Sequence, residues 1–157
     1  MAPGMDTSIL VWHYTIGSRE SAISDSGCLL AAVDGVRDHE SPITWFSARQ
    51  DFEPTARIMM IRTEGRPAVR LSRFETAKIG SGLVRYGLPR ASAIPWLKLC
   101  GVARIRLADQ KRLERAGRNL GADPLEWFGV IGPVSLEAIA AIEYSDGIVP
   151  WHAGSIS

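Results

Sequence analysis

The chain has 157 residues, of which 46% are hydrophobic and 22% charged, and eighteen Lys and Arg stand against seventeen Asp and Glu. This length suits one domain over residues 1–157, and the composition excludes a disordered or fibrous protein. A net charge of +1 gives no global field that would attract nucleic acid or an anionic membrane, although a local basic patch stays possible.

The cellular setting is indicated by what the sequence lacks. No stretch approaches the roughly 18 uninterrupted apolar residues of a membrane span, and residues 1–6 lack the cationic start of a signal peptide. Cys28 and Cys100 are too few for a disulfide framework or an all-thiolate zinc site. We expect a cytoplasmic protein with no membrane association and two reduced thiols, with a single bridge between them as the alternative.

The first half of the chain predicts two strands and a short helix. Residues 9–15 are rich in β-branched and aromatic side chains, which favour a strand. Serines near residue 18 and the Ser26-Gly27 pair are typical of the start and the end of a short helix. Residues 34–42 are polar and predict a loop, residues 43–47 predict a second strand, and a helix-prone segment begins at Asp51.

The second half adds more strands and one amphipathic helix. Apolar residues at helical spacing predict that helix over residues 105–120, and residues 95–99 suit a short helical turn. Alternating or apolar patterns predict further strands over residues 68–71, 83–88, 125–131 and 138–144. About seven short strands without regular βαβ alternation predict an α+β fold with mostly antiparallel pairing.

Several common site chemistries find no support. His13, His39 and His152 are far apart, and no pair has the spacing of a compact ligand set, so we expect no metal site. The glycines at 80–82 and 129–132 lack the lysine of a phosphate loop, and no Gly-x-Ser-x-Gly elbow occurs.

The remaining candidates are polar residues within aromatic strands. The side chain of His13 should leave the first strand on the face opposite its aromatic neighbours, and Ser47 should share a face with Trp45. Glu126 directly precedes Trp127, a costly place for a carboxylate unless it faces a cleft or a partner. The alternative is that each is a surface or hydrogen-bonded polar residue of an amphipathic strand.

The order of these segments resembles the ADP-ribosyltransferase fold family in its His-Tyr-Glu type, and is similar to small bacterial and phage members. The resemblance rests on His13-Tyr14-Thr15 in an early strand, a helix ending at Gly27, Trp45-Phe46-Ser47 in a middle strand, and Glu126-Trp127 in a late strand. It implies split, mostly antiparallel sheets that enclose an NAD cleft.

The same resemblance implies roles for individual residues. His13 would hydrogen-bond a ribose of NAD, and Glu126 would be the catalytic carboxylate. The cofactor-binding set would be His13, Tyr14, Thr15, Trp45, Phe46, Ser47 and Arg85, with Arg49 as a further candidate contact to the diphosphate.

The expected reaction is cleavage of the nicotinamide–ribose bond of NAD, the substrate, with transfer of ADP-ribose to a protein or nucleic-acid acceptor, or to water. The family includes toxins, so an antitoxin or other protein partner is a further expectation. Pro124, two positions before Glu126, has no polar side chain to direct an acceptor, so the acceptor stays open.

Two alternatives remain. One is an RNA 2'-phosphotransferase of the same fold, which also would use NAD. The other is a catalytically inert binding or inhibitor protein, for which five tryptophans could supply an interface, Trp151 above all.

Overall fold

Six strands form one sheet in which every neighbouring pair runs antiparallel, in the order β10-β6-β1-β3-β8-β7. The computed structural model describes residues 9–60, 65 and 67–154. The strands are β1 Leu10–Ile16, β3 Ile43–Ser47, β6 Leu83–Pro89, β7 Ile94–Pro95, β8 Trp127–Ile131 and β10 Ala141–Ser145. The α+β class with antiparallel pairing that the sequence predicts is therefore present.

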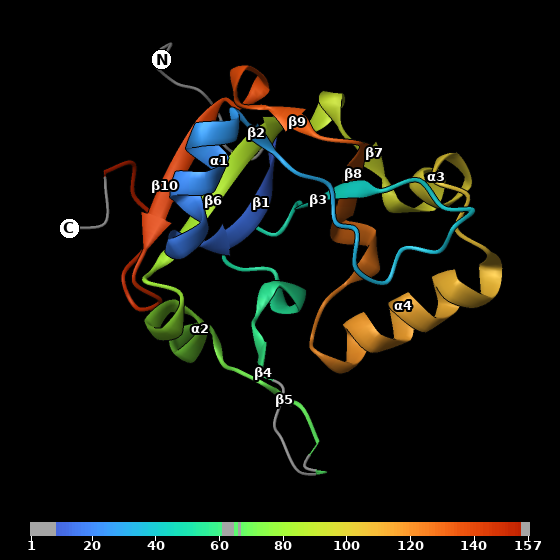
Figure 1. Cartoon of the computed structure of the whole chain (residues 1–157), viewed down its shortest axis with the longest axis horizontal. Coiled ribbons are helices and arrows are strands. Elements are labelled where there is room, and N and C mark those ends of the chain that lie inside the picture. The colour runs from blue at the N-terminus through green and yellow to red at the C-terminus, as the bar shows by residue number, and fades with distance from the viewer. Residues whose placement is uncertain (1–8, 61–64, 66, 155–157) are drawn as a thin grey trace.

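Helices and short ribbons surround this sheet. The helices are α1 Glu20–Ser26, α2 Arg73–Ile79, α3 Trp96–Val102 and α4 Leu107–Asn119, and the two-stranded ribbons join β2 Cys28–Leu29 to β9 Val134–Ser135 and β4 Met59–Met60 to β5 Val69–Arg70. Single 3₁₀ turns are η2 Gly17–Arg19, η3 Pro54–Ala56, η4 Arg90–Ser92, η5 Pro124–Glu126 and η6 Leu136–Ala138. Figure 1 shows α1 beside β1, β6 and β10, and α3 and α4 at the opposite side, next to β7 and β8.

Several predicted elements occur nearly as expected. The strand at residues 43–47 is β3, and the helix that should end at Gly27 is α1, where Gly27 has a φ of 73° and donates its N–H to the Ile23 carbonyl. Only a residue without a Cβ adopts this left-handed conformation freely, so the glycine ends the helix. The amphipathic pattern at 105–120 corresponds to α4.

Other elements differ from the prediction. Residues 51–60 form no regular helix, because the Glu53 side chain accepts from the Thr55 N–H and Pro54 starts a single turn, η3. The helix α2 was not predicted, although Ser72 and Glu75 form a reciprocal capping box at its start.

Both predicted late strands begin later than expected, β8 at Trp127 and β10 at Ala141. In the first case the Asp123 side chain accepts from the Leu125 N–H and closes the turn η5 before the strand. Glu126 therefore lies in a turn, and its predicted place on a strand is wrong.

The sheet opens between β1 and β3, and this opening positions the site. All seven residues of β1 pair with β6, whereas β1 and β3 share only the pair Trp12 and Ser47. On one face of β1, Val11 packs in a cluster with Phe46. On the other, Trp12 packs in a cluster with Leu10, Tyr14 and Phe52. The sheet is thus continuous in order but split at its centre.

None of the helices in the described ranges is long and apolar enough to cross a membrane. The first six residues, on which the expectation of no signal peptide depends, lie outside the described part of the chain. Cys28 and Cys100 are not joined to each other, and Cys100 is buried.

Candidate functional site

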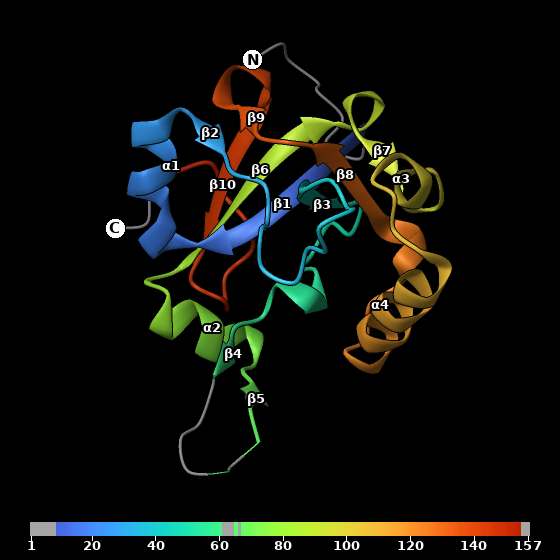
Figure 2. The same ribbon diagram turned by 45° about the vertical axis from the view of Figure 1, so that its right-hand side comes forward.

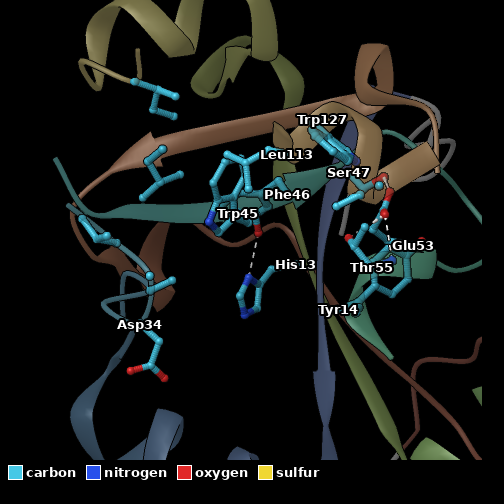
Figure 3. Close-up of a pocket in the computed structure, with 18 of the residues that line it drawn as sticks. His13, Tyr14, Asp34, Trp45, Phe46, Ser47, Glu53, Thr55, Leu113 and Trp127 are labelled. Carbon is cyan, nitrogen blue, oxygen red and sulfur yellow. Dashed lines mark hydrogen bonds between the residues drawn. The ribbon is translucent and has the colours of Figure 1, made fainter. Parts of the chain in front are cut away.

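A cavity of about 980 Å³ lies beside the split between β1 and β3. Its wall is built from β1, β3, the loop before β3, the turn η3 and the helix α4. Figure 3 shows the central part of this wall, with His13 and Trp45 beside the open space. The volume is at the upper end of the range for small-molecule and cofactor sites.

His13 is held in one orientation by the backbone of β3. Its Nδ1 lies 2.7 Å from the carbonyl oxygen of Trp45, and because a carbonyl can only accept, Nδ1 must carry the proton. The ring also meets Phe46 edge to face, with centroids 5.8 Å apart. Burial, which penalises the charged imidazolium, lowers the pKa of His13, and the positive charge of Arg19 acts in the same direction. The imidazole is therefore neutral near pH 7, and its Nε2 is a hydrogen-bond acceptor.

Glu53 places a buried carboxylate in the cavity wall. Its Oε1 accepts from the Ser47 hydroxyl over 3.0 Å, and its Oε2 accepts from the N–H and hydroxyl of Thr55 over 3.0 and 2.7 Å. These three donors offset the cost of burying the group, which is only 6% exposed. A carboxylate has about four lone-pair positions, so one remains for a ligand donor.

In Figure 3 the side chain of His13 lies on one side of β1, and that of Tyr14 lies on the other side, near Glu53. Neighbouring residues of a strand point to opposite faces, so His13 and Glu53 approach the cavity from different sides of β1.

Aromatic side chains and residues of α4 also line the cavity. They are Trp45, Phe46 and Trp127 together with Leu113 and Gly117 of α4. The indole N–H of Trp127 is buried and has no hydrogen-bond partner within the described residues. An acceptor on a ligand would satisfy this donor.

Three arginines add positive charge to the wall. Arg37 donates twice to Asp109, and Arg112 lies 3.5 Å from the same carboxylate. Arg70 differs, because it donates only to the carbonyl of Arg57, and its buried Nε has no partner among the residues described. Burial and the nearby charge of Arg57 lower the pKa of Arg70. An anionic ligand group would accept a hydrogen bond from the Nε of Arg70 and would stabilise its positive charge.

Of the predicted site residues, the structure brings five together in the cavity wall: His13, Tyr14, Trp45, Phe46 and Ser47. Thr15, Arg49, Arg85 and Glu126 are not part of this wall. Thr15 is a buried residue of β1, in register with Val84 of β6.

Arg85 is part of the sheet's own packing. Its guanidinium pairs with Glu143 on β10 and lies 3.9 Å from the centroid of the Trp12 ring. It also donates to the carbonyl of Gln50, and the side chain is only 8% exposed. These contacts already engage the charge that a diphosphate would need, and Arg85 lies outside the cavity wall, so its role as a cofactor contact stays a prediction.

Glu126 is likewise engaged away from the cavity. Its Oε1 lies 2.8 Å from the Arg49 guanidinium, which also donates to the carbonyl of Gly121. Of His13, Ser47 and Glu126, only His13 and Ser47 therefore line the cavity. The predicted acid and the predicted diphosphate contact Arg49 neutralise each other.

Glu53 was missed, although the sequence carried a signal for it. It stands between Phe52 and Pro54, so the argument that a carboxylate beside an aromatic residue is costly applies to Glu53 as well as to Glu126. Only its hydrogen bonds to Ser47 and Thr55 distinguish it.

A group of possible metal ligands lies at the cavity's rim. Ligand atoms of His39, Glu40 and Asp109 lie within 4.8 Å of one another. The guanidinium of Arg37 forms an ion pair with Asp109, whereas Glu40 accepts a hydrogen bond from the main-chain N–H of Arg37. Of the two carboxylates, Asp109 is therefore already paired with an arginine.

Comparison of the chain with protein-family models, with curated proteins and with solved structures finds no match.

Proposed function

We propose that the cavity binds NAD and that the protein breaks the bond between nicotinamide and ribose, passing ADP-ribose to a macromolecular acceptor or to water. The proposal depends above all on one observation: an oriented, neutral imidazole and a buried, hydrogen-bonded carboxylate line the same cavity. The split antiparallel sheet around it agrees with the ADP-ribosyltransferase-like fold that the sequence resembles.

His13 would hold a ribose hydroxyl. With its Nδ1 proton donated to Trp45, the free Nε2 can accept a hydrogen bond from a hydroxyl but cannot donate one. The role is one of orientation, because a fixed ribose presents its anomeric carbon in one geometry. NAD has two riboses joined by a diphosphate, and both His13 and Glu53 line the cavity in which it would lie.

Glu53 would take the part that the sequence predicted for Glu126. When the C–N bond breaks, its electron pair leaves with neutral nicotinamide and the ribose carbon becomes oxocarbenium-like. A carboxylate stabilises this cation and accepts a hydrogen bond from the ribose 2'-hydroxyl. The acceptor's oxygen or nitrogen then bonds to the carbon and loses its proton to solvent water. Glu53 is the carboxylate that the cavity offers in a buried, oriented form.

Other wall residues suit the remaining parts of NAD. Trp45 and Phe46 offer flat faces for nicotinamide, and the unpaired indole N–H of Trp127 suits a carboxamide or phosphate oxygen. Arg70, which has no carboxylate partner among the described residues, suits the diphosphate.

The test is release of nicotinamide by the purified protein, with two glutamine variants compared. We expect Glu53→Gln to lower turnover by about two to three orders of magnitude, the typical effect of losing one preorganised polar group. Glu126→Gln is the matched control, since it breaks only the pair with Arg49 and should retain most of the activity. If Glu126→Gln lost its activity while Glu53→Gln kept it, Glu126 would be the catalytic carboxylate. If the wild-type protein released no nicotinamide, the proposal would be refuted.

His13→Asn separates binding from folding. The asparagine amide can replace Nδ1 as donor to Trp45, but it offers no atom at the place of Nε2. The variant should keep its thermal stability while its KM for NAD rises. An unchanged KM would remove His13 from the NAD site.

The arginines of the cavity wall support a second candidate, an RNA 2'-phosphotransferase. Arg70 and Arg112 could surround a phosphate, as that reaction needs. RNA with a 2'-phosphate, mixed with NAD, distinguishes the two, because only this candidate removes the phosphate from the RNA.

A further inference from the structure

Basic residues are concentrated in α4 and in the segment directly before it. Six of the chain's eighteen Lys and Arg lie within residues 104–118, where only two acids occur. The remaining 142 residues carry twelve Lys and Arg against fifteen Asp and Glu, so they are net negative. The near-neutral total of +1 thus conceals one positive region.

Both acids of this segment face inward. Asp109 is 8% exposed and pairs with Arg37 and Arg112. Glu114 accepts from the indole N–H of Trp96 over 2.7 Å and from Gln110. The outward side of the helix is therefore free of negative charge.

Lys111, Arg115 and Arg118 form a row on that outward side. They are spaced by four and then three residues, so they lie on one face of the helix, one turn apart. All three are exposed, and no carboxylate of the described residues forms an ion pair with them. Like charges at this spacing repel one another. A bound polyanion would remove that repulsion.

The row lies next to the cavity. Arg112, which follows Lys111 on the adjacent flank of the helix, is itself part of the cavity wall, together with Leu113 and Ala116. Figure 2 shows α4 at the edge of the molecule, with the sheet on one side of it and open space on the other. A chain bound along this row would pass the cavity.

We propose that the outward face of α4, formed by Lys111, Arg115 and Arg118, binds the phosphodiester backbone of a nucleic acid. Evenly spaced cations match evenly spaced phosphates, and guanidinium groups suit phosphate oxygens. The negative remainder of the chain orients a polyanion toward this face. A membrane fits less well, because Leu107 is the one large apolar side chain that α4 exposes.

Binding of a nucleic acid to this surface also indicates which class of molecule accepts ADP-ribose. Resting on the proposed function, the nucleic acid held along α4 is the acceptor of ADP-ribose, since its bases or its end can reach the cavity beside Arg112. The binding itself depends only on the charge of the face.

The test measures binding of a fluorescently labelled oligonucleotide by anisotropy, with single-stranded DNA, single-stranded RNA and duplex DNA as separate probes. Arg115→Ala/Arg118→Ala should weaken binding about tenfold and lower the slope of log affinity against log salt by about 1.4, for two lost contacts to a single strand. Lys78→Ala/Arg90→Ala removes the same charge from exposed positions elsewhere and should change binding little. Circular dichroism shows whether each variant keeps its helices.

Each result decides the proposal. No binding of any oligonucleotide at low salt, an equal loss in both double variants, or equally tight binding of phosphatidylserine vesicles would overturn it. Failure of the two proposals is distinguishable: a protein that binds the oligonucleotide but releases no nicotinamide keeps the α4 surface and loses the NAD function. A protein that releases nicotinamide but binds no oligonucleotide keeps the NAD function and loses the α4 surface.

Discussion

Gly117 of α4 lies against the indole ring of Trp127, so closely that a Cβ on this glycine would be 2.5 Å from the ring's Cη2. Both residues belong to the cavity wall. The missing side chain therefore sets how closely α4 approaches β8, and with it the width of the cavity.

Substitution of Gly117 by alanine should destabilise the protein. Alanine favours a helix interior by about 1 kcal/mol over glycine, but overlap with a buried ring costs roughly 1–3 kcal/mol, and Trp127 is only 8% exposed. We expect a net loss of unfolding free energy in a urea titration. Gly101→Ala in α3 is the control, because a Cβ there meets nothing within 4 Å, and it should stabilise the protein. Equal stability of the two variants would contradict the close contact.

Local sequence patterns predicted the elements that frame the site. Residues 43–47 could be recognised as a strand and Gly27 as a helix end, because side-chain type and backbone conformation act within a few positions there. The boundary near Glu126 was missed although its cause is also local, because Asp123 and Pro124 form the turn η5 directly before the strand.

The choice between two carboxylates was beyond the sequence. Glu53 and Glu126 each stand next to an aromatic residue, and nothing local separates them. Their difference comes from partners: Glu53 accepts from Ser47 at the end of β3, whereas Glu126 meets Arg49, 77 residues earlier in the chain. Which acid faces the cavity follows from tertiary contacts alone.

The pH dependence of stability should report on His13. The pKa of His13 in the folded protein is lowered from its ordinary 6.5, so below this value the unfolded chain binds a proton that the folded protein excludes. Stability that is present above pH 6.5 is therefore lost as the pH falls toward the lowered value. Between pH about 7.5 and about 5 the wild type should lose more unfolding free energy than His13→Asn. Parallel losses in both proteins would show that His13 titrates normally.

Arg85 and Arg70 should behave in opposite ways. Arg85→Met leaves Glu143 unpaired in a largely buried place, and breaking such a pair costs roughly 3–5 kcal/mol of unfolding free energy. Arg70 has no carboxylate partner in the described structure, so Arg70→Met should change stability by less than about 0.5 kcal/mol. Calorimetric titration with NAD should instead show weaker binding to Arg70→Met. A stable Arg85→Met with weakened NAD binding would return Arg85 to the cofactor site.

The conformation of the loop before β3 should depend on the ion pair that attaches this loop to α4. Arg37 of this loop donates to both oxygens of Asp109, over 2.8 and 2.9 Å, and these hydrogen bonds are the main reason why the pKa of Asp109 is lowered from its ordinary 3.8. The attachment is present above that value and is lost only as the pH falls through the lowered pKa.

Asp109→Asn should release the loop at neutral pH without unfolding the protein. Amide hydrogens of residues 34–41 should then exchange faster with solvent, because this loop opens independently of the sheet once its ion pair is gone. Asp51→Asn is the matched control, since it removes an arginine pair, with Arg73, outside this loop. Unchanged exchange at residues 34–41 in Asp109→Asn would show that other contacts hold the loop. Faster exchange together with a higher KM for NAD would show that the Arg37–Asp109 pair closes the cavity from this side.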